Sequence, residues 1–347
     1  MAGPARRDLA FVIPMRTKLD ALVRHRDAAL DELRLHYVEA GPDDRDAPTI
    51  VLLHGFPDFW YGWRYQLVAL AEAGVRVLAP DLRGYDRSDK PSSVAAYAVR
   101  PLVQDIVQLL ERTCSAPPLL VGHDWGGILA WWTAMLAPHC IDRLAIVNAP
   151  HPAQLRTAMT RPAQALRLWY VLYFQLPWVP ERLLARDGHA PLLETLRRYG
   201  VIVTDDDRTR YAEAFAQGSL TAMLNYYRAL GRPRALRELA ALRPIDHPTL
   251  VLWGERDPVL LPALAHPPDR WVRDARVERI ASAGHWPQID CAERFTRHLL
   301  EWRASTGGDR IVQSGAQHGA HDQMMKGPND VEIDRTRPMS IVHDRHE

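Results

Sequence analysis

Hydrophobic residues recur along this chain in two different patterns. Short apolar runs rich in leucine, isoleucine and valine are typical of buried β-strands. They are Leu33–Glu39, Thr49–Leu53, Val75–Ala79, Leu119–Val121, Leu144–Val147, Leu250–Trp253 and Arg276–Ile280. The segments between them are amphipathic, and the apolar side chains of Val99–Leu110 share one helical face. Strands that alternate with helices predict an α/β fold with a mostly parallel central sheet flanked by helices.

This alternation stops between about Pro150 and Pro244. Strand-like runs nearly vanish there, and aromatic, helix-forming segments such as Leu166–Gln175 and Tyr211–Leu230 replace them. We interpret the region as a helical cap inserted into the sheet domain. The expected organisation is an N-terminal extension over 1–32, a first core segment over 33–149, the cap over 150–244, a second core segment over 245–303 and a tail over 304–347.

The expected tail differs in composition from the rest of the chain. From Ser305 onward Gly, Gln, His and Asp are frequent and apolar residues rarely cluster, so little surface can be buried. We expect this segment to be disordered and to have no part in catalysis.

Composition and charge exclude several classes of protein. With 347 residues, 47% of them hydrophobic, the chain can bury one large core or two modest ones, as a globular enzyme does. Its 43 Lys and Arg residues balance 42 Asp and Glu residues, and the sequence has no basic stripe with interleaved aromatics. Nucleic acid is therefore not an expected partner. The sequence does not indicate an oligomeric state.

The cysteines and the apolar runs bear on the cellular compartment. Cys114, Cys140 and Cys291 have no paired spacing, which indicates neither a disulfide framework nor a zinc site. The apolar run Leu9–Pro14 is too brief for a signal peptide, and no stretch approaches the roughly 20 apolar residues of a membrane span. We expect a cytoplasmic protein with no membrane insertion, no metal and no cofactor.

The stretch GHDWGG at 122–127 joins a predicted strand to a predicted helix. Its central residue, Asp124, has a glycine two positions before it and another two positions after it. This is the pattern of a sharp turn that lifts one side chain above the sheet, and serine is its usual occupant. An aspartate at such a turn can also be a helix N-cap, but a cap needs no flanking glycines. We therefore interpret Asp124 as a nucleophile.

A nucleophile of this kind needs a histidine and an acid, and two downstream loops contain them. Asp257 lies in GERDP, directly after the predicted strand Leu250–Trp253, and His285 lies in AGHW after the next strand. Both loops follow the C-terminal ends of strands, where open α/β sheets bind their ligands. Asn148 follows an earlier strand but is not an acid, so Asp257 is the better candidate for orienting His285.

A fourth motif, HGFP at 54–57, ends the strand Thr49–Leu53. That strand is expected beside the turn at Asp124. The backbone N–H groups of Phe56 and Trp125 could then form an oxyanion hole. Alone this motif is a weak signal, and it becomes specific only in combination with Asp124, Asp257 and His285.

Together these motifs resemble the α/β-hydrolases with an aspartate nucleophile, and most closely the epoxide hydrolases. The likeness is carried by HGFPDFWYGWR at 54–64, DLRGYDRSD at 81–89, GHDWGG at 122–127, GERDPV at 254–259 and GHWPQ at 284–288. It covers about residues 33–303. Two positions depart from the family pattern: Asp58 stands where glutamate is common, and Asp86 stands where glycine is common.

The resemblance implies a reaction in two steps. A carboxylate that attacks an sp³ carbon forms an alkyl ester, which water activated by a histidine can hydrolyse, whereas a serine ether could not be hydrolysed. Epoxide hydrolases of this type use two cap tyrosines as acids for ring opening. The first tyrosine motif matches at Tyr170 in WYVLYFQ, and the second matches at Tyr227 in NYYR. Tyr173 and Tyr226 are expected to be packing residues.

The expected substrates are a small apolar epoxide and water. The residues expected to contact the epoxide are Phe56, Trp125, Trp169 and Phe174. A haloalkane dehalogenase is the alternative, because it shares the aspartate nucleophile and binds halide with the indole that follows it, here Trp125. Such enzymes usually add a second halide donor, whereas this chain has a matched tyrosine pair. A third alternative, a ligand-binding relative without activity, is expected to have lost triad members, and all are present here.

Overall fold

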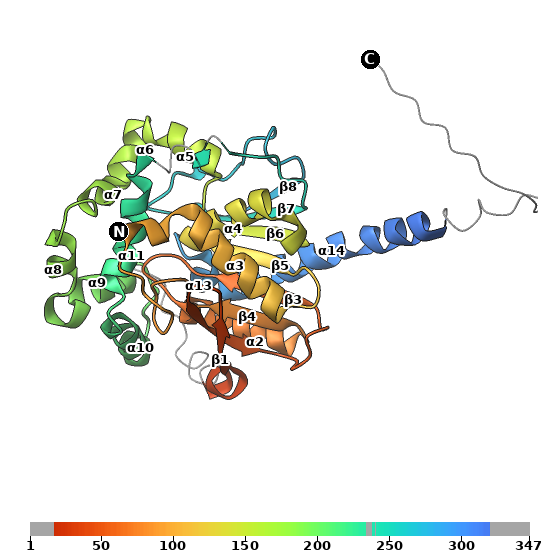
Figure 1. Cartoon of the computed structure of the whole chain (residues 1–347), viewed down its shortest axis with the longest axis horizontal. Coiled ribbons are helices and arrows are strands. Elements are labelled where there is room, and N and C mark those ends of the chain that lie inside the picture. The colour runs from red at the N-terminus through yellow and green to blue at the C-terminus, as the bar shows by residue number, and fades with distance from the viewer. Residues whose placement is uncertain (1–16, 234–237, 240, 320–347) are drawn as a thin grey trace, which may run out of the picture. The chain divides into compact units, whose positions relative to one another are not determined.

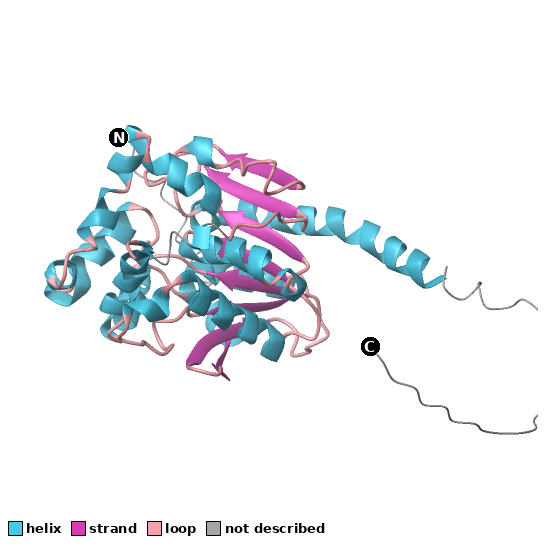
Figure 2. Cartoon of the chain, turned by 45° about the horizontal axis from the view of Figure 1, so that its top comes forward, coloured by secondary structure: helices cyan, strands magenta, loops and turns pink. Residues whose placement is uncertain are grey.

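A computed structural model describes residues 17–319 of the chain, apart from 234–237 and 240. Among these residues eight strands form one sheet, in the order β1-β2-β4-β3-β5-β6-β7-β8 (Figures 1 and 2). They are β1 (Arg24–Ala29), β2 (Arg34–Ala40), β3 (Thr49–Leu53), β4 (Arg76–Pro80), β5 (Leu119–His123), β6 (Arg143–Val147), β7 (Thr249–Gly254) and β8 (Ala275–Ile280). The pairs β1·β2 and β2·β4 are antiparallel, and every other pair in the sheet is parallel. The predicted α/β fold is confirmed.

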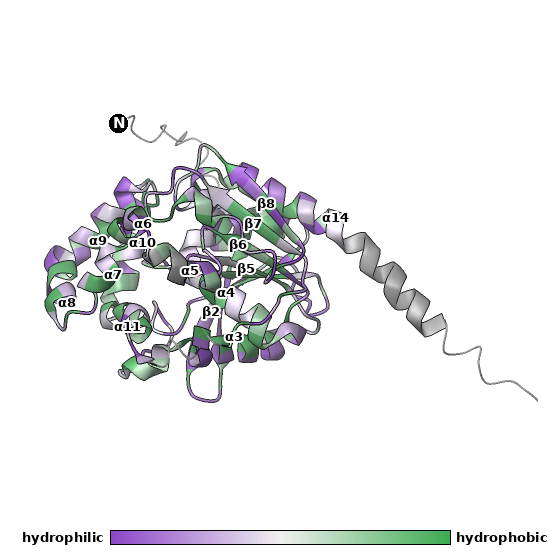
Figure 3. Cartoon of the chain, turned by 90° about the horizontal axis from the view of Figure 1, so that it is seen from above, coloured by the Kyte–Doolittle hydropathy of each residue, from purple (hydrophilic) through white to green (hydrophobic). Residues whose placement is uncertain are grey.

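Seven of these strands coincide with the seven predicted runs, and β1 is the one that the hydrophobic pattern missed. Its sequence, RHRDAA, is mostly polar, and only Ala28 in it is buried. A polar run suffices there because β1 lies at the edge of the sheet and pairs with β2 alone. Part of the expected N-terminal extension is therefore a strand of the sheet. The central strands β5, β6 and β7, by contrast, are almost wholly buried. Figure 3 shows that these strands are largely hydrophobic.

Helices before and after the cap region flank this sheet. They are α2 (Arg64–Glu72), α3 (Val99–Thr113), α4 (Trp125–Leu136), α13 (Pro287–Asp290) and the part of α14 (Ala292–Gly319) up to Trp302, with short 3₁₀ turns η1 (Trp60–Trp63), η2 (Val94–Tyr97), η3 (Pro138–Cys140) and η4 (Pro262–Leu264). Helix α3 buries the apolar face predicted from its spacing. Helix α4 is apolar nearly all round because it packs on β5, β6 and α3.

The chain between β6 and β7 is helical, with no strand among its described residues. Its helices are α5 (Pro152–Met159), α6 (Pro162–Arg167), α7 (Trp169–Tyr173), α8 (Val179–Leu184), α9 (Arg186–Arg198), α10 (Asp205–Ala216) and α11 (Leu220–Leu230). The expected helical segment 211–230 is broken at Gly218, whose φ of 79° ends α10 before α11 begins. The exact boundaries of core and cap stay a prediction, since the described residues through Trp302 form one compact unit.

Buried polar contacts tie α10 to the loop and turn after β3. The Tyr61 hydroxyl donates to Asp207 at 3.0 Å, and the Tyr211 hydroxyl donates to Asp58 at 2.7 Å. Arg64 adds a hydrogen bond to the carbonyl of Val201 at 2.8 Å. Because the side chains of these donors and acceptors are buried, losing one partner would leave the other unsatisfied, which makes this contact specific.

The expected tail is helical in its first part, since α14 continues to Gly319. The pattern of apolar residues did not predict this continuation, because the segment has no regular apolar face. The remainder, 320–347, lies outside the described residues, and the expectation that the tail is dispensable stays a prediction. No helix in the described part of the chain combines the length and the apolar character that crossing a membrane requires.

Candidate active site

The turn at Asp124 has the backbone that its sequence predicts. Asp124 lies between β5 and α4 with φ 50° and ψ −118°, a conformation that non-glycine residues rarely adopt. A Cβ atom on Gly122 would lie 2.3 Å from the carbonyl oxygen of Gly126, and one on Gly126 would lie 2.4 Å from that of Leu53. Both positions therefore require glycine. The Asp124 side chain makes no capping hydrogen bond, so the N-cap interpretation does not hold.

The two carboxylate oxygens of Asp124 have different surroundings. The backbone N–H of Phe56 donates to Oδ1 at 2.8 Å. Oδ2 lies 3.6 Å from Nε2 of His285. Trp125 is the first residue of α4, and N–H groups at that position have no acceptor within the helix. Its role as a second oxyanion donor stays a prediction.

His285 is held from behind by Asp257. Its Nδ1 donates to Oδ2 of Asp257 at 2.7 Å. The backbone N–H groups of Val259 and Leu260 donate to the other oxygen, Oδ1, at 2.7 and 2.9 Å. These contacts fix both the position of the carboxylate and the orientation of the imidazole. The three residues that the motifs singled out are thus adjacent, on loops after β5, β7 and β8.

Two further residues support this arrangement, and their contacts were not foreseen from the sequence. The amide of Asn148 donates to Oδ2 of Asp257 at 2.6 Å, and its oxygen accepts from the N–H of Gly254 at 2.8 Å. Nε2 of His123 donates to the backbone carbonyl of His285 at 2.7 Å. His123 is the last residue of β5, and Asn148 directly follows β6 at the same edge of the sheet. These positions were the only indication in the sequence that the two residues lie near the site.

The charges of the three groups stabilise one another. Burial raises the pKa of Asp124, but the adjacent His285 and the Phe56 N–H outweigh it and leave the pKa below its usual range. Burial likewise raises the pKa of Asp257, but His285 and Asn148 outweigh this effect, and the net pKa lies below its usual range. Burial lowers the pKa of His285, and the two carboxylates reverse this and raise it to about 10. Near neutral pH the site is an imidazolium between two carboxylates.

A cavity of about 340 Å³ opens above Asp124. Its wall combines one carboxylate, two tyrosines and a largely apolar surface. Tyr170 comes from α7 and Tyr227 from α11, and their rings meet edge to face with centroids 5.8 Å apart. Burial raises the pKa of both phenols, and the charge of Asp124 raises both further. Both hydroxyls therefore keep their protons at neutral pH and can donate hydrogen bonds.

The neighbouring tyrosines have other surroundings. The Tyr226 hydroxyl donates to the backbone carbonyl of Arg83 at 2.7 Å, and its ring packs on Tyr85 and Tyr97. Tyr173 packs against Trp169, and neither residue lines the cavity. Consecutive helical residues point about 100° apart, which explains why Tyr227 faces the cavity and Tyr226 does not.

Of the four residues expected to bind substrate, only Trp125 lines the cavity. Phe56 and Phe174 lie behind the wall, where both pack on the ring of Tyr227. Trp169 is 61% exposed and does not line the cavity, so it is not placed to contact the substrate. Its helix turns the neighbouring Tyr170 toward the cavity instead. Lining residues that were not predicted include Ile128, one helical turn after Asp124.

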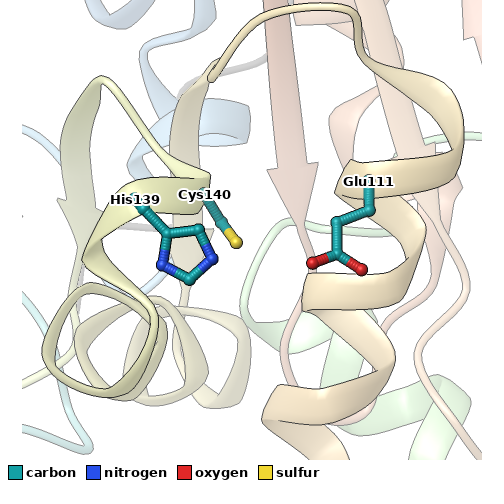
Figure 4. Close-up of side chains that lie close together, drawn as sticks. All are labelled: Glu111, His139 and Cys140. Carbon is teal, nitrogen blue, oxygen red and sulfur yellow. The ribbon is translucent and has the colours of Figure 1, made fainter. Parts of the chain in front are cut away.

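Two sets of possible metal ligands occur in the described part of the chain, and neither lines the cavity. Glu111 of α3 faces His139 and Cys140 of η3, with their donor atoms within 4.8 Å of one another (Figure 4). η3 precedes β6, so this set lies at the edge of the sheet opposite Asp124. The other set is formed by His36, Asp81 and Asp86, all buried.

Comparison with known proteins gives consistent results. The family model described as alpha/beta hydrolase fold matches residues 48–292. The AB hydrolase superfamily protein YfhM of Bacillus subtilis is 40% identical over 274 residues, which cover 78% of this chain and 94% of that protein. Epoxide hydrolase 2 of Caenorhabditis elegans is 37% identical over 276 residues, which cover 77% of this chain and 76% of that protein. The crystal structure of Bacillus megaterium epoxide hydrolase in complex with an inhibitor superposes with a TM-score of 0.72 at 30% identity, covering 80% of this chain and 99% of that one.

Proposed function

We propose that this chain, which belongs to the epoxide hydrolases of the α/β-hydrolase family, converts an apolar epoxide to a vicinal diol through a covalent ester on Asp124. One observation carries the proposal. The Asp124 carboxylate and the side chains of Tyr170 and Tyr227 line a single, mostly apolar cavity. A nucleophile and two protonated phenols are the groups that opening an epoxide ring requires.

The first step is ring opening. Oδ1 of Asp124 is held by the Phe56 N–H, which leaves Oδ2 as the attacking atom. Oδ2 forms a bond to a ring carbon while the bond from that carbon to the epoxide oxygen breaks. The oxygen leaves as an alkoxide, which takes a proton from the tyrosine pair. The product of this step is a hydroxyalkyl ester of Asp124.

The second step is hydrolysis of that ester. Esterification removes the charge of Asp124, one of the two carboxylates that raise the pKa of His285. His285 can then release its proton, which restores by way of solvent the tyrosine deprotonated in ring opening, and accept one from a water molecule, which attacks Cγ of Asp124. Negative charge develops on Oδ1, beside the N–H groups of Phe56 and Trp125. When the intermediate collapses, Oδ2 takes the proton from His285 and leaves as a hydroxyl of the diol. The oxygen of the water stays in the regenerated carboxylate, whose remaining proton returns to His285.

The surroundings of Trp125 weigh against a dehalogenase. In such an enzyme the indole N–H of this residue would bind the departing halide. Here the Trp125 ring meets the Tyr227 ring edge to face, with centroids 5.4 Å apart. The indole therefore helps to hold a proton donor for an alkoxide, a leaving group far more basic than halide.

The experiment that tests the proposal traps the ester. His285→Gln, incubated with a panel of small epoxides, should gain the mass of one substrate at Asp124 and then stall, since only the second step needs the histidine. Asp124→Asn/His285→Gln is the matched control and should gain nothing. A single turnover of the parent in H₂¹⁸O should place the label in Asp124 rather than in the diol. Absence of the adduct, or faster halide release from haloalkanes than opening of any epoxide, would overturn the proposal.

A further inference from the structure

The outer face of the cap exposes large apolar side chains. All the large hydrophobic side chains that are exposed in the described part of the chain lie within α6–α8 and their connections, or at the end of α11. We call this surface the apolar cap face and define it by Leu166, Trp169, Leu172, Leu176, Trp178 and Leu230. Side chains of this size are normally buried, and their collection on one part of a surface marks an interaction site.

The segment 166–176, which comprises the end of α6, helix α7 and the turn after it, exposes mostly apolar side chains. Tyr170, Val171 and Leu172 line the cavity, and Leu172 is also 71% exposed, whereas Trp169 is 61% exposed and does not line the cavity. A surface helix ordinarily presents polar residues to water, and a helix that is apolar all round is covered on every side. Nothing among the described residues covers the outer side of this segment.

Trp178 adds a second observation. It has φ 59° and ψ −23°, in the left-handed region that disfavours large side chains, and it is 72% exposed. Asparagine or glycine would suit this backbone better. A tryptophan here is strained and gains little packing within the described chain, which is understandable if its indole is buried against something else.

The mouth of the cavity lies on this surface. Leu172 and Leu230 belong to the apolar cap face and also line the cavity above Asp124. An apolar molecule bound to the face would therefore be next to the entrance of the site.

The charges around the face are mostly positive. The segment 161–186 contains four arginines and one acidic residue, Glu181, a net charge of +3 in a chain whose total is +1. Glu181 is paired with Arg228 at 2.7 Å. Arg161, Arg182, Arg186 and Arg232 are exposed. Tryptophan and leucine surrounded by arginine form the composition that binds the interface of an anionic lipid layer.

We infer that the apolar cap face docks on an anionic lipid surface, so that the cavity receives apolar epoxides directly from the lipid phase. The part of this inference that concerns epoxides rests on the proposed function, whereas docking does not. A second copy of the chain fits the face less well, because two such faces would bring like charges together. In the lipid-bound state the indole of Trp178 and the leucines enter the headgroup region, and the arginines contact lipid phosphates. The substrate then reaches Asp124 without crossing water.

Docking is tested with the full chain and two kinds of vesicle, one of phosphatidylcholine alone and one of phosphatidylcholine mixed with phosphatidylglycerol. Co-flotation should be strong with the anionic vesicles, weak with the neutral ones, and should fall as salt is added. Equal binding to both vesicles, or no binding to either, would overturn the inference.

Variants separate the two components of the surface. Arg182→Gln/Arg186→Gln should bind anionic vesicles about tenfold more weakly, since each arginine contributes to attraction by acidic lipid. The matched control, Arg273→Gln/Arg297→Gln, removes two exposed arginines outside the cap and should bind like the parent. If both pairs lost binding equally, the effect would be one of net charge and the inference would be wrong.

Trp178→Asn tests the apolar component. Asparagine tolerates left-handed backbone, so the variant should melt at a higher temperature than the parent while binding vesicles more weakly. Trp178→Phe should retain most of the binding. Undiminished vesicle binding by Trp178→Asn would contradict the inference, and so would concentration-dependent dimerisation of the parent that this variant abolishes without any vesicle binding.

Turnover distinguishes failure of this inference from failure of the proposed function. Anionic vesicles should accelerate hydrolysis of a long-chain alkyl epoxide dissolved in them and leave hydrolysis of a short, water-soluble epoxide unchanged. Trp178→Asn should lose this acceleration and keep parental turnover of the soluble epoxide. Vesicle binding without any epoxide turnover would refute the proposed function alone, whereas turnover of both epoxides without a vesicle effect would refute the lipid route alone.

Discussion

Two groups in this molecule are built from one histidine and two aspartates, and they differ in every electrostatic respect. Both groups are buried except for the partly open Asp124, and both include an aspartate with positive φ, 50° at Asp124 and 35° at Asp86. The first group is the proposed catalytic triad Asp124, Asp257 and His285. The second, which we call the His36 cluster, is His36 with Asp81 and Asp86.

Near neutral pH the triad is fully ionised, whereas in the His36 cluster the histidine is neutral and the two acids are only partly ionised. In the triad the pKa of the histidine is raised to about 10 and both carboxyl pKa values are lowered. In the cluster burial dominates: it lowers the pKa of His36 to about 4, and it raises those of Asp81 and Asp86 to about 7. Nδ1 of His36 donates to Asp81 at 2.6 Å, and Asp86 shares a hydrogen bond with Asp81.

The difference lies in the donors that surround each carboxylate. Asp257 accepts two backbone N–H groups and the Asn148 amide in addition to His285. Asp81 accepts from the backbone N–H of Trp60 and from Nδ1 of His36, but its other close neighbour is a second acid, Asp86. Residue type and burial are thus not enough to make a reactive group. Ionisation is maintained only where backbone donors and an opposite charge outweigh desolvation.

The largest expected effect comes from changing the corresponding aspartates of the two groups. Asp124→Asn should lower kcat for an epoxide by at least about 10⁴-fold, because an amide is a poor nucleophile. Asp86→Asn should leave kcat close to that of the parent, since its side chain does not line the cavity. Steady-state kinetics on the folded variants, checked by circular dichroism, measures both. A comparable loss in Asp86→Asn would mean that the two groups are coupled.

The second-largest effect is expected from the two tyrosines that line the cavity beside Asp124. Tyr170→Phe and Tyr227→Phe should each slow ester formation by about 10- to 1,000-fold, and the double variant should be nearly inactive, since no other donor is expected at the alkoxide. Tyr173→Phe and Tyr226→Phe are matched controls outside the cavity and should turn over almost like the parent. Rapid-quench measurement of the first step gives these rates. Full turnover by the double variant would remove the tyrosines from the mechanism.

The pH dependence of stability tests the protonation of the His36 cluster. The pKa of Asp86 rises from 3.8 to about 7 on folding, so between these values the folded state retains a proton that the unfolded state releases. The parent should therefore lose stability as pH rises through this window. Asp86→Asn cannot ionise, so its free energy of unfolding relative to that of the parent should rise by about 2 kcal/mol over the same range. His36 has the opposite slope and Asp81 the same slope, but both are present in the two proteins, so only the change that the substitution makes in their pKa values adds to the difference. Urea unfolding at pH 5 and pH 8 measures the difference, and a constant difference would contradict a shared proton.

The smallest expected effect concerns the ionisation of Asp124. His285 is the main influence that lowers the pKa of Asp124 against burial, so His285→Gln should raise it. The rate of adduct formation needs the carboxylate, and its decline in acid should begin at a higher pH in the variant than in the parent. Single-turnover mass spectrometry across pH 4–8, with the parent quenched before deacylation, gives both profiles. Coincident profiles would show that the histidine does not tune the nucleophile.

Much of the fold was predictable because it is encoded locally. Seven strands were readable from apolar runs that only a buried sheet requires, and the turn at Asp124 was readable from two glycines that steric contact makes obligatory. The polar edge strand β1 was not readable, since an edge strand needs hydrogen bonds to a neighbour more than apolar side chains.

The sequence by itself determined the α/β fold and the order of Asp124, Asp257 and His285, because each is marked by residues close along the chain, and the resemblance to a known family predicted the pair Tyr170 and Tyr227. Only the tertiary structure decided what surrounds them. Asn148 meets Asp257 across 109 positions, and no local pattern records such a contact. The same holds for the ionisation of each carboxyl group and for the exposure of Trp169, which depend on how many donors and side chains the whole fold brings to one place.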